Sequence, residues 1–135
     1  MKIISIISCG AIYALTFFAN PQEELTKSVA RGKELYKESC ITCHLANGEG
    51  VKGTFPPLAK ADFLTKFPDK SIQAIKFGMK GPIKVNGVDY NNAMPPSGFA
   101  DDEIADVMNY IRNSFGNKNT QIVTEKMVAA VKEKH

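Results

Sequence analysis

The sequence predicts an all-α domain that carries one small β-hairpin, and three observations lead to this fold class. Apolar residues recur at helical spacing in two stretches, residues 25–36 and residues 104–115. Asn86-Gly87 separates two short β-prone runs, which is the strongest short-range signal for a hairpin. Between the helical stretches lies the run Cys40-Ile41-Thr42-Cys43-His44, which predicts a large covalent group for the helices to surround.

This run has the spacing of a c-type haem attachment motif. The thiols of Cys40 and Cys43 can each add to a vinyl group of the porphyrin, and their spacing lets both reach one edge of the ring. The same spacing places His44 where an imidazole nitrogen can bind the iron. We therefore expect one covalent haem c, with its iron, held by these three residues.

Three other interpretations of the cysteines are weaker. A thioredoxin-like redox pair would follow a strand, whereas a helical pattern precedes Cys40 here. A structural zinc site needs four ligands, and beyond the N-terminal segment only His135 adds to the motif. A disulfide would leave His44 without a role.

The length of 135 residues predicts one small domain, whose limited core a covalent apolar cofactor would help to hold together. A net charge of +3 is too small to indicate a nucleic-acid partner. The three cysteines do not make an even disulfide framework.

Residues 1–19 have the pattern of an export signal, because Lys2 precedes an apolar run. Cleavage after Ala19 would leave residues 20–135 as the domain, with a core of about residues 28–116 and a short helical tail. Two alternatives stay open: the segment is kept as a membrane anchor, or Cys9 carries a lipid. All three predict a periplasmic domain, and only the two alternatives attach it to a membrane.

The first helical stretch leads directly into Cys40, after a polar lead-in from Asn20 to Thr26. Residues 47–53 form a Gly-rich, flexible loop after the motif. The next run, residues 55–58, holds two prolines, which fix φ twice and remove two donors. We expect it to be a rigid, extended wall beside the haem.

The carbonyls of this wall stay free to accept hydrogen bonds. A metal-bound histidine normally donates its second ring N–H to such an acceptor, which fixes its tautomer. We assign this role to Pro56 or Pro57 as the partner of His44. Leu58 is expected to pack on the haem face.

Residues 59–67 predict a short helix that Pro68 ends. A second helix follows, with Asp69 or Ser71 as its cap and Gly78 near its end. Its inward residues are expected to be Ile72, Ile75 and Met79. Residues 83–90 then form the hairpin around Asn86-Gly87.

Met94, followed by Pro95-Pro96, is the second residue with a chemical role. A methionine thioether is the usual sixth ligand of such a haem and raises its reduction potential. Met79 and Met108 have the spacing of core residues, and Met127 lies in the tail. We therefore predict Met94 as the second axial ligand.

Residues 101–115 predict the last main helix, with acids in its first turn, Arg112 near its end and Gly116 as its stop. Residues 124–134 predict one further short helix, to which the sequence assigns no role.

From about residue 28 to residue 116 the chain resembles the class I c-type cytochromes. The matching positions are Gly32, Tyr36, Cys40, Cys43, His44, Pro56, Leu58, Met94, Val107 and Tyr110. The resemblance implies the cytochrome c fold around one haem. Residues 55–59, 81–87 and 94–96 also resemble the haem domains fused to copper nitrite reductases and related small bacterial cytochromes. No catalytic domain is attached here, so this narrower resemblance implies electron delivery only.

The chain is thus expected to be a one-electron carrier between extracytoplasmic redox proteins, such as a reductase or dehydrogenase, and not an enzyme. One alternative is a haem subunit docked on a larger oxidoreductase. The other is an enzyme or sensor with an open iron, against which two filled axial positions argue. Charge is uneven: residues 51–84 hold seven lysines and two aspartates, whereas residues 85–111 hold five acids and no Lys or Arg. Such asymmetry can orient a redox partner.

Overall fold

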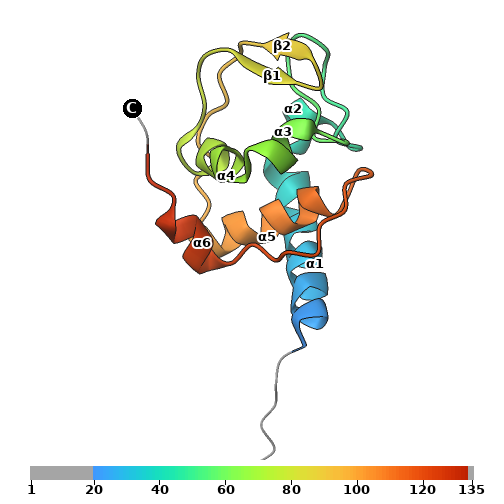
Figure 1. The fold of residues 1–135 in the computed structure, drawn as a ribbon, viewed down its shortest axis with the longest axis vertical. Coiled ribbons are helices and arrows are strands. Elements are labelled where there is room, and N and C mark those ends of the chain that lie inside the picture. Colours follow the sequence, from blue (N-terminus) through green and yellow to red (C-terminus); the bar gives the residue numbers. More distant parts are fainter. Residues whose placement is uncertain (1–19, 134–135) are drawn as a thin grey trace, which may run out of the picture.

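The structure, a computed structural model, describes residues 20–133. Its elements in chain order are α1 (Pro21–Ser39), α2 (Ile41–His44), α3 (Asp62–Lys66), α4 (Pro68–Phe77), β1 (Ile83–Val85), β2 (Val88–Tyr90), α5 (Asp101–Arg112) and α6 (Glu125–Ala130). In Figure 1 α5 crosses α1, and the hairpin β1–β2 lies at the opposite end of the domain from α6. The predicted all-α fold with one small antiparallel hairpin is confirmed.

The expected export signal lies outside the described residues. Within residues 20–133, no helix combines the length and the apolar character that a bilayer-crossing segment needs.

Helix α1 begins earlier than predicted, because Asn20 caps it. The Asn20 side-chain oxygen accepts the N–H of Gln22 at 3.1 Å, and Pro21 occupies the first helical position. Glu23 and Glu24 lie in the first turn, where the helix dipole favours acids. The expectation that Asn20–Thr26 is a polar lead-in was therefore wrong: these residues are the cap and the first turns of the helix.

The crossing of α1 and α5 is close because Gly32 has no side chain. A Cβ at Gly32 would overlap the carbonyl oxygen of Asp106, so the backbones of the two helices are nearly in contact. Tyr36, one turn further along α1, is almost fully buried and packs at a tilt against Tyr110 of α5, with ring centroids 5.4 Å apart. The crossing is thus set by one residue without a side chain and one aromatic pair.

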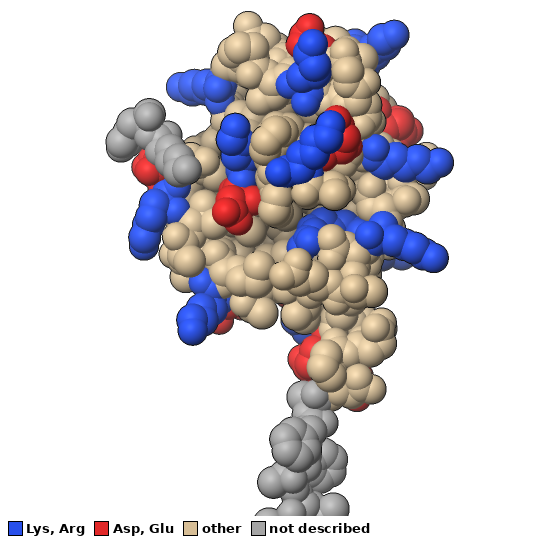
Figure 2. All heavy atoms as spheres, viewed as in Figure 1, with Lys and Arg blue, Asp and Glu red and all other residues tan. Residues whose placement is uncertain are grey.

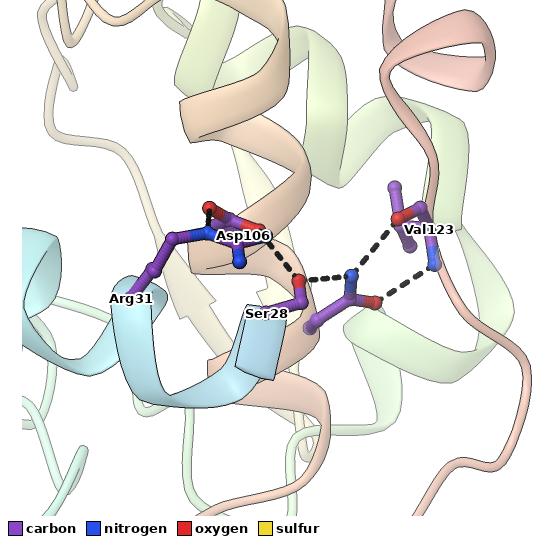
Figure 3. A network of polar contacts seen from close by, with 5 residues as sticks. Ser28, Arg31, Asp106 and Val123 are labelled. Atoms are coloured by element: carbon purple, nitrogen blue, oxygen red, sulfur yellow. Dashed lines mark hydrogen bonds and ion pairs between the residues drawn. The ribbon is translucent and has the colours of Figure 1, made fainter. Parts of the chain in front are cut away.

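A buried polar network also joins the two helices (Figure 3). Ser28 donates to Asp106 at 2.6 Å, and the Arg31 guanidinium forms an ion pair with the same carboxylate. The side-chain amide of Asn109 donates to Ser28 Oγ at 2.8 Å and to the carbonyl of Val123 at 2.9 Å, and it accepts the N–H of Val123 at 2.8 Å. The network therefore connects α1, α5 and the chain that follows α5.

Helices α3 and α4 and the hairpin form the other half of the domain. The caps predicted for α4 were wrong: the helix starts at Pro68, no side chain caps it, and Ser71 donates instead to the Phe67 carbonyl at 3.0 Å. Pro68 thus follows the end of α3 and is itself the first residue of α4, a position that proline favours. The Asn86-Gly87 turn has φ of 50° and 80°, as two-residue hairpin turns require, and pairs Val85 with Val88.

Helix α5 ends at Arg112, three residues before the predicted end. Phe115 takes a φ of 59° and packs its ring on Tyr36, with centroids 5.2 Å apart. Asn113 already has non-helical backbone angles, so Phe115 lies beyond the helix and its apolar spacing reflects this aromatic contact.

Residues 117–133, called here the C-terminal strap, run back along α5 (Figure 1). The strap buries Val123 and Val128 and contains α6, which is shorter than the helix predicted for the tail. Lys76 of α4 donates to the Val128 carbonyl at 3.2 Å. The tail is therefore packed on the domain.

Two lysines of the lysine-rich segment form ion pairs with acids of the acidic segment. Lys76 forms an ion pair with Asp101 at 2.7 Å, and Lys84 forms one with Asp89 at 3.4 Å, each joining the lysine-rich segment to the acidic one. On the face that Figure 2 shows, Lys and Arg side chains predominate, with a few Asp and Glu side chains among them. The two ion pairs bring part of the lysine-rich segment against part of the acidic one.

Candidate haem-binding site

One apolar cavity gathers all six residues that the sequence singles out for the cofactor. It holds about 1020 Å³ of empty space, counted to its open mouth. Its lining includes Cys40, Cys43, His44, Pro56, Leu58 and Met94. Cofactor pockets have mainly apolar walls with a few placed polar groups, so the chemistry of this cavity fits a porphyrin.

The attachment motif faces the cavity because it is itself a turn of helix. Cys40 follows α1 directly, and the His44 N–H donates to the Cys40 carbonyl at 3.0 Å, as in an α-helix. Residues at positions i, i+3 and i+4 share one side of a helix. The side chains of Cys40, Cys43 and His44 therefore reach the same cavity.

Tyr36 fixes this turn to the first helix. Its hydroxyl donates to the carbonyl of Leu45 at 2.7 Å, one residue beyond the motif. Leu45 has a φ of 63°, which ends α2. The position of His44 is thus tied to the α1–α5 crossing through one buried hydrogen bond.

His44 is buried, and its Nδ1 lies 3.0 Å from the carbonyl oxygen of Pro56. A carbonyl can only accept, so Nδ1 carries the hydrogen and Nε2 keeps its lone pair. Of the two prolines that the sequence offered for this role, the structure therefore selects Pro56. The arrangement leaves one ring nitrogen able to bind a metal.

The wall that contains Pro56 is held in place by the preceding loop. The N–H groups of Leu58 and Ala59 both donate to the Gly48 carbonyl, at 2.7 and 2.8 Å, and the Gly50 N–H donates to the His44 carbonyl at 3.0 Å. Gly50 has a φ of 60°, and a side chain there would overlap the carbonyl oxygen of Phe55. The loop between the motif and the wall is thus internally bonded and fixes their relative position.

Burial changes the proton affinities of the two kinds of site residue in opposite directions. It lowers the pKa of His44, against a smaller opposing effect of the hydrogen bond to Pro56, and so favours the neutral imidazole that can bind iron. Burial, with a smaller contribution from Cys43, raises the pKa of the Cys40 thiol to about 11. Both groups are thus uncharged at neutral pH in the folded chain.

Met94 reaches the cavity from the segment after the hairpin and is partly buried. It is joined to Met79 by two backbone hydrogen bonds: Met79 N–H to Met94 O at 2.8 Å, and Met94 N–H to Met79 O at 2.9 Å. Met79 also lines the cavity, whereas the sequence indicated only a core residue. Met108 is fully buried in α5 outside the cavity lining, and Met127 is exposed.

Two residues at the cavity had no signal in the sequence. The Asn92 side chain donates to the Thr54 carbonyl at 3.1 Å, and both residues line the cavity. This bond links the Met94 segment to the proline wall across 38 positions of sequence. Asn92 lies two residues before Met94, but the sequence assigned neither it nor Thr54 a role, because a single polar contact at this separation leaves no periodic pattern.

The other interpretations of the cysteines receive no support from the described residues. Cys40 and Cys43 are both free of disulfide bonds. Within residues 20–133, no three His, Cys, Asp or Glu side chains gather as a metal ion would require.

Comparison with known proteins agrees with this geometry. The family model described as Cytochrome c matches residues 29–115. Cytochrome c-552 of Thermus thermophilus is 39% identical over 100 residues, which are 69% of this chain and 66% of the relative. A second cytochrome c-552 from Thermus thermophilus is 40% identical over 95 residues, which are 65% of this chain and 70% of the relative.

Two further relatives are subunits of dehydrogenases. The cytochrome c subunit of the quinone alcohol dehydrogenase of Gluconobacter oxydans is 36% identical over 89 residues, which are 64% of this chain. The cytochrome c subunit of gluconate 2-dehydrogenase of Pantoea cypripedii is 32% identical over 106 residues, which are 76% of this chain. The matched regions cover only 18% and 24% of these two subunits, so the present chain is similar to one part of each.

Proposed function

This chain belongs to the cytochrome c family and carries covalently bound haem c, and from this premise we propose that it is a one-electron carrier with His44 and Met94 as axial ligands. The proposal includes export of the domain, so that its redox partners lie outside the cytoplasm. It also includes the absence of catalysis: the chain passes electrons and transforms no substrate.

The observation that carries the proposal is that two attachment residues and two potential iron ligands meet in one apolar cavity. Cys40 and Cys43 supply two thiols, His44 an imidazole and Met94 a thioether, and these residues come from segments that lie fifty positions apart in sequence. Haem, when bound, supplies an iron that cycles between the ferrous and ferric states. Among the cavity-lining residues, the histidine and the methionines are the donors that such an iron commonly takes as axial ligands.

The protein contributes to electron transfer by fixing the orientation of these groups and by excluding water from them. The bond from His44 to Pro56 fixes the imidazole tautomer and ring angle. The lining of the cavity is almost wholly apolar, which excludes water and limits reorganisation when the charge on the iron changes. The bond between Asn92 and Thr54 ties the Met94 segment to the opposite wall.

The similarity to dehydrogenase subunits supports a second candidate function. In that case the chain is a haem subunit docked on a larger oxidoreductase, and its partner is a dehydrogenase. Purification from native membranes and periplasm separates the two cases. A free carrier elutes alone with its haem, whereas a docked subunit elutes at constant ratio with a dehydrogenase. The narrower similarity to haem domains of copper nitrite reductases stays a prediction.

The attachment is tested by replacing both cysteines. The full chain is produced in a host that attaches haem c, and denaturing gels are stained for haem. We expect Cys40→Ala with Cys43→Ala to lose the stained band, and Thr42→Ala, an exposed change within the motif, to keep it. A stained band in the double variant would contradict the attachment.

The axial ligation is tested on the wild-type protein by spectroscopy. A thioether on ferric iron produces a weak band near the red edge of the spectrum, and a filled sixth position slows the binding of carbon monoxide to ferrous iron. We expect both properties. A wild-type protein that lacks the band and binds carbon monoxide at once is an open-iron sensor or enzyme, not a carrier.

A further inference from the structure

The cavity presents two methionine side chains at the same wall. Met79 follows α4 and Met94 follows the hairpin, and each donates its backbone N–H to the carbonyl of the other. They form an isolated antiparallel bridge, outside the two named strands. Both residues are partly buried, and both line the cavity.

The form of this bridge determines where the two side chains point. Residues that exchange both hydrogen bonds in an antiparallel pair lie directly opposite each other, with Cα atoms roughly 5.5 Å apart, and their side chains lie on the same side of the ladder. The presence of both residues in the cavity lining agrees with this rule. The two thioethers therefore approach the cavity as neighbours.

The backbone on both sides of the bridge is held by further contacts. Gly78, with a φ of 81°, ends α4 where a side chain would approach the Met94 carbonyl. The Ser97 N–H donates to the Ile75 carbonyl at 2.9 Å, which ties the chain after Met94 to α4. On its other side the bridge borders a shallow hollow lined by Phe77 and Pro96, so it is not packed against the core there.

We propose that Met79 is a reserve axial ligand: its thioether takes the sixth position when the thioether of Met94 leaves it. This inference rests on the proposed function, in which Met94 is the ligand. The exchange breaks one iron–sulfur bond and forms another, and both ligands are neutral, so no proton, electron or net charge moves. A long, unbranched side chain with several rotatable bonds suits such an adjustment.

The inference is specific to Met79. Met108 is fully buried in α5 and is not part of the cavity lining, and Met127 lies exposed on α6. A leucine at position 79 would pack against the cofactor equally well but could not donate a lone pair. Methionine at position 79 therefore offers a sulfur lone pair that packing alone would not require.

The test compares four proteins: wild type, Met79→Leu, Met94→Ala, and the double variant with both changes. Each holoprotein is examined for the ferric sulfur-to-iron band and for the rate of carbon monoxide binding. We expect wild type and Met79→Leu to keep the band, and Met94→Ala to keep a sulfur band at a shifted position while binding carbon monoxide slowly. Only the double variant should lose the band and bind carbon monoxide at once.

Two results would overturn the inference. If Met94→Ala loses the band as completely as the double variant, Met79 does not reach the iron; if Met79→Leu alone loses it, Met79 is the primary ligand. A wild type without the band contradicts the proposed function itself, which keeps the two failures distinct. Should Met94→Ala fail to take up haem, Met94→Leu keeps the side-chain volume and is judged by the same criteria.

Discussion

At the scale of single residues, Tyr36 does the most to connect the fold to the site. Its ring forms a three-membered aromatic cluster with Tyr110 and Phe115, and its hydroxyl donates to the Leu45 carbonyl immediately after the attachment motif. Burial is the main cause that raises the pKa of Tyr36 above its ordinary value. The same side chain thus couples the helix crossing, the position of His44 and the response to alkaline pH.

Tyr36→Phe is expected to change the alkaline stability of the protein. The raised pKa means that Tyr36 keeps its proton in the folded state after the unfolded chain begins to lose it. The contribution of Tyr36 to the free energy of unfolding is therefore fully present below pH about 10 and declines as pH rises further. At neutral pH the variant should lose about 1 kcal/mol of this free energy, because the hydrogen bond to Leu45 is gone. Above pH about 10 the difference in unfolding free energy between wild type and variant should become smaller.

Urea unfolding of the holoproteins between pH 7 and pH 11 measures this difference. Tyr110→Phe is the control, because it removes a neighbouring hydroxyl and leaves Tyr36 in place. The free energy of unfolding of this control should fall at alkaline pH as it does in wild type. Parallel pH profiles for wild type and Tyr36→Phe would contradict the expected role.

At the scale of elements, α5 is the helix on which the rest of the domain is assembled. One face meets α1 at Gly32, another contributes Val107 and Ile111 to the cavity, and a third holds the C-terminal strap. Asn109 is the main polar link to the strap, because its amide pairs with both backbone groups of Val123 as a neighbouring strand would. The strap is therefore bonded to the helix by a side chain.

Asn109→Asp is expected to release the strap from α5. The carboxylate keeps the shape of the amide but loses both donors, so Ser28 and the Val123 carbonyl lose their partner in a buried place. A buried polar group left without its hydrogen bond costs about 1–3 kcal/mol, and a buried unpaired charge adds to this. Hydrogen exchange should become faster at Val123 and Val128 and remain slow in α1.

Asn91→Asp provides the matched control, because Asn91 is exposed and receives the same chemical change. It should leave both the stability and the exchange of the strap unchanged. Equal protection of Val128 in wild type and Asn109→Asp would show that apolar packing alone holds the strap.

At the scale of the whole molecule, the core is built around the cavity. Seven buried members of the main hydrophobic cluster also line it: Ala61, Leu64, Ile75, Val85, Tyr90, Val107 and Ile111. Without the cofactor these core side chains face an unfilled cavity that is open to solvent, so they lose apolar burial and packing contacts. A small domain has only a narrow margin of stability to offset this loss.

The haem-free chain, made by Cys40→Ala with Cys43→Ala and haem extraction, is therefore expected to lose its fixed tertiary structure. Helical far-ultraviolet dichroism should persist in part, while near-ultraviolet dichroism and cooperative urea unfolding should disappear. The wild-type holoprotein measured in parallel is the control. A cooperative transition in the haem-free chain would show that the helices pack without the cofactor.

Features that local chemistry encodes can be predicted from the amino-acid sequence alone. The spacing of Cys40, Cys43 and His44 predicts the cofactor, the apolar periodicities predict α1 and α5, and Asn86-Gly87 predicts the hairpin. These signals succeed because each depends on residues a few positions apart. Where a local signal was misjudged, as at Asn20 and Pro68, the error concerned where a helix begins and left the fold unchanged.

The contacts between distant segments become visible only in the folded chain. It selects Pro56 over Pro57 as the partner of His44, and it pairs Lys76 with Asp101. It also packs the strap on α5 and brings Met79 beside Met94. The physical reason is that each of these contacts depends on the path of the whole backbone, and a single hydrogen bond or ion pair between remote residues imposes no period or spacing on the sequence.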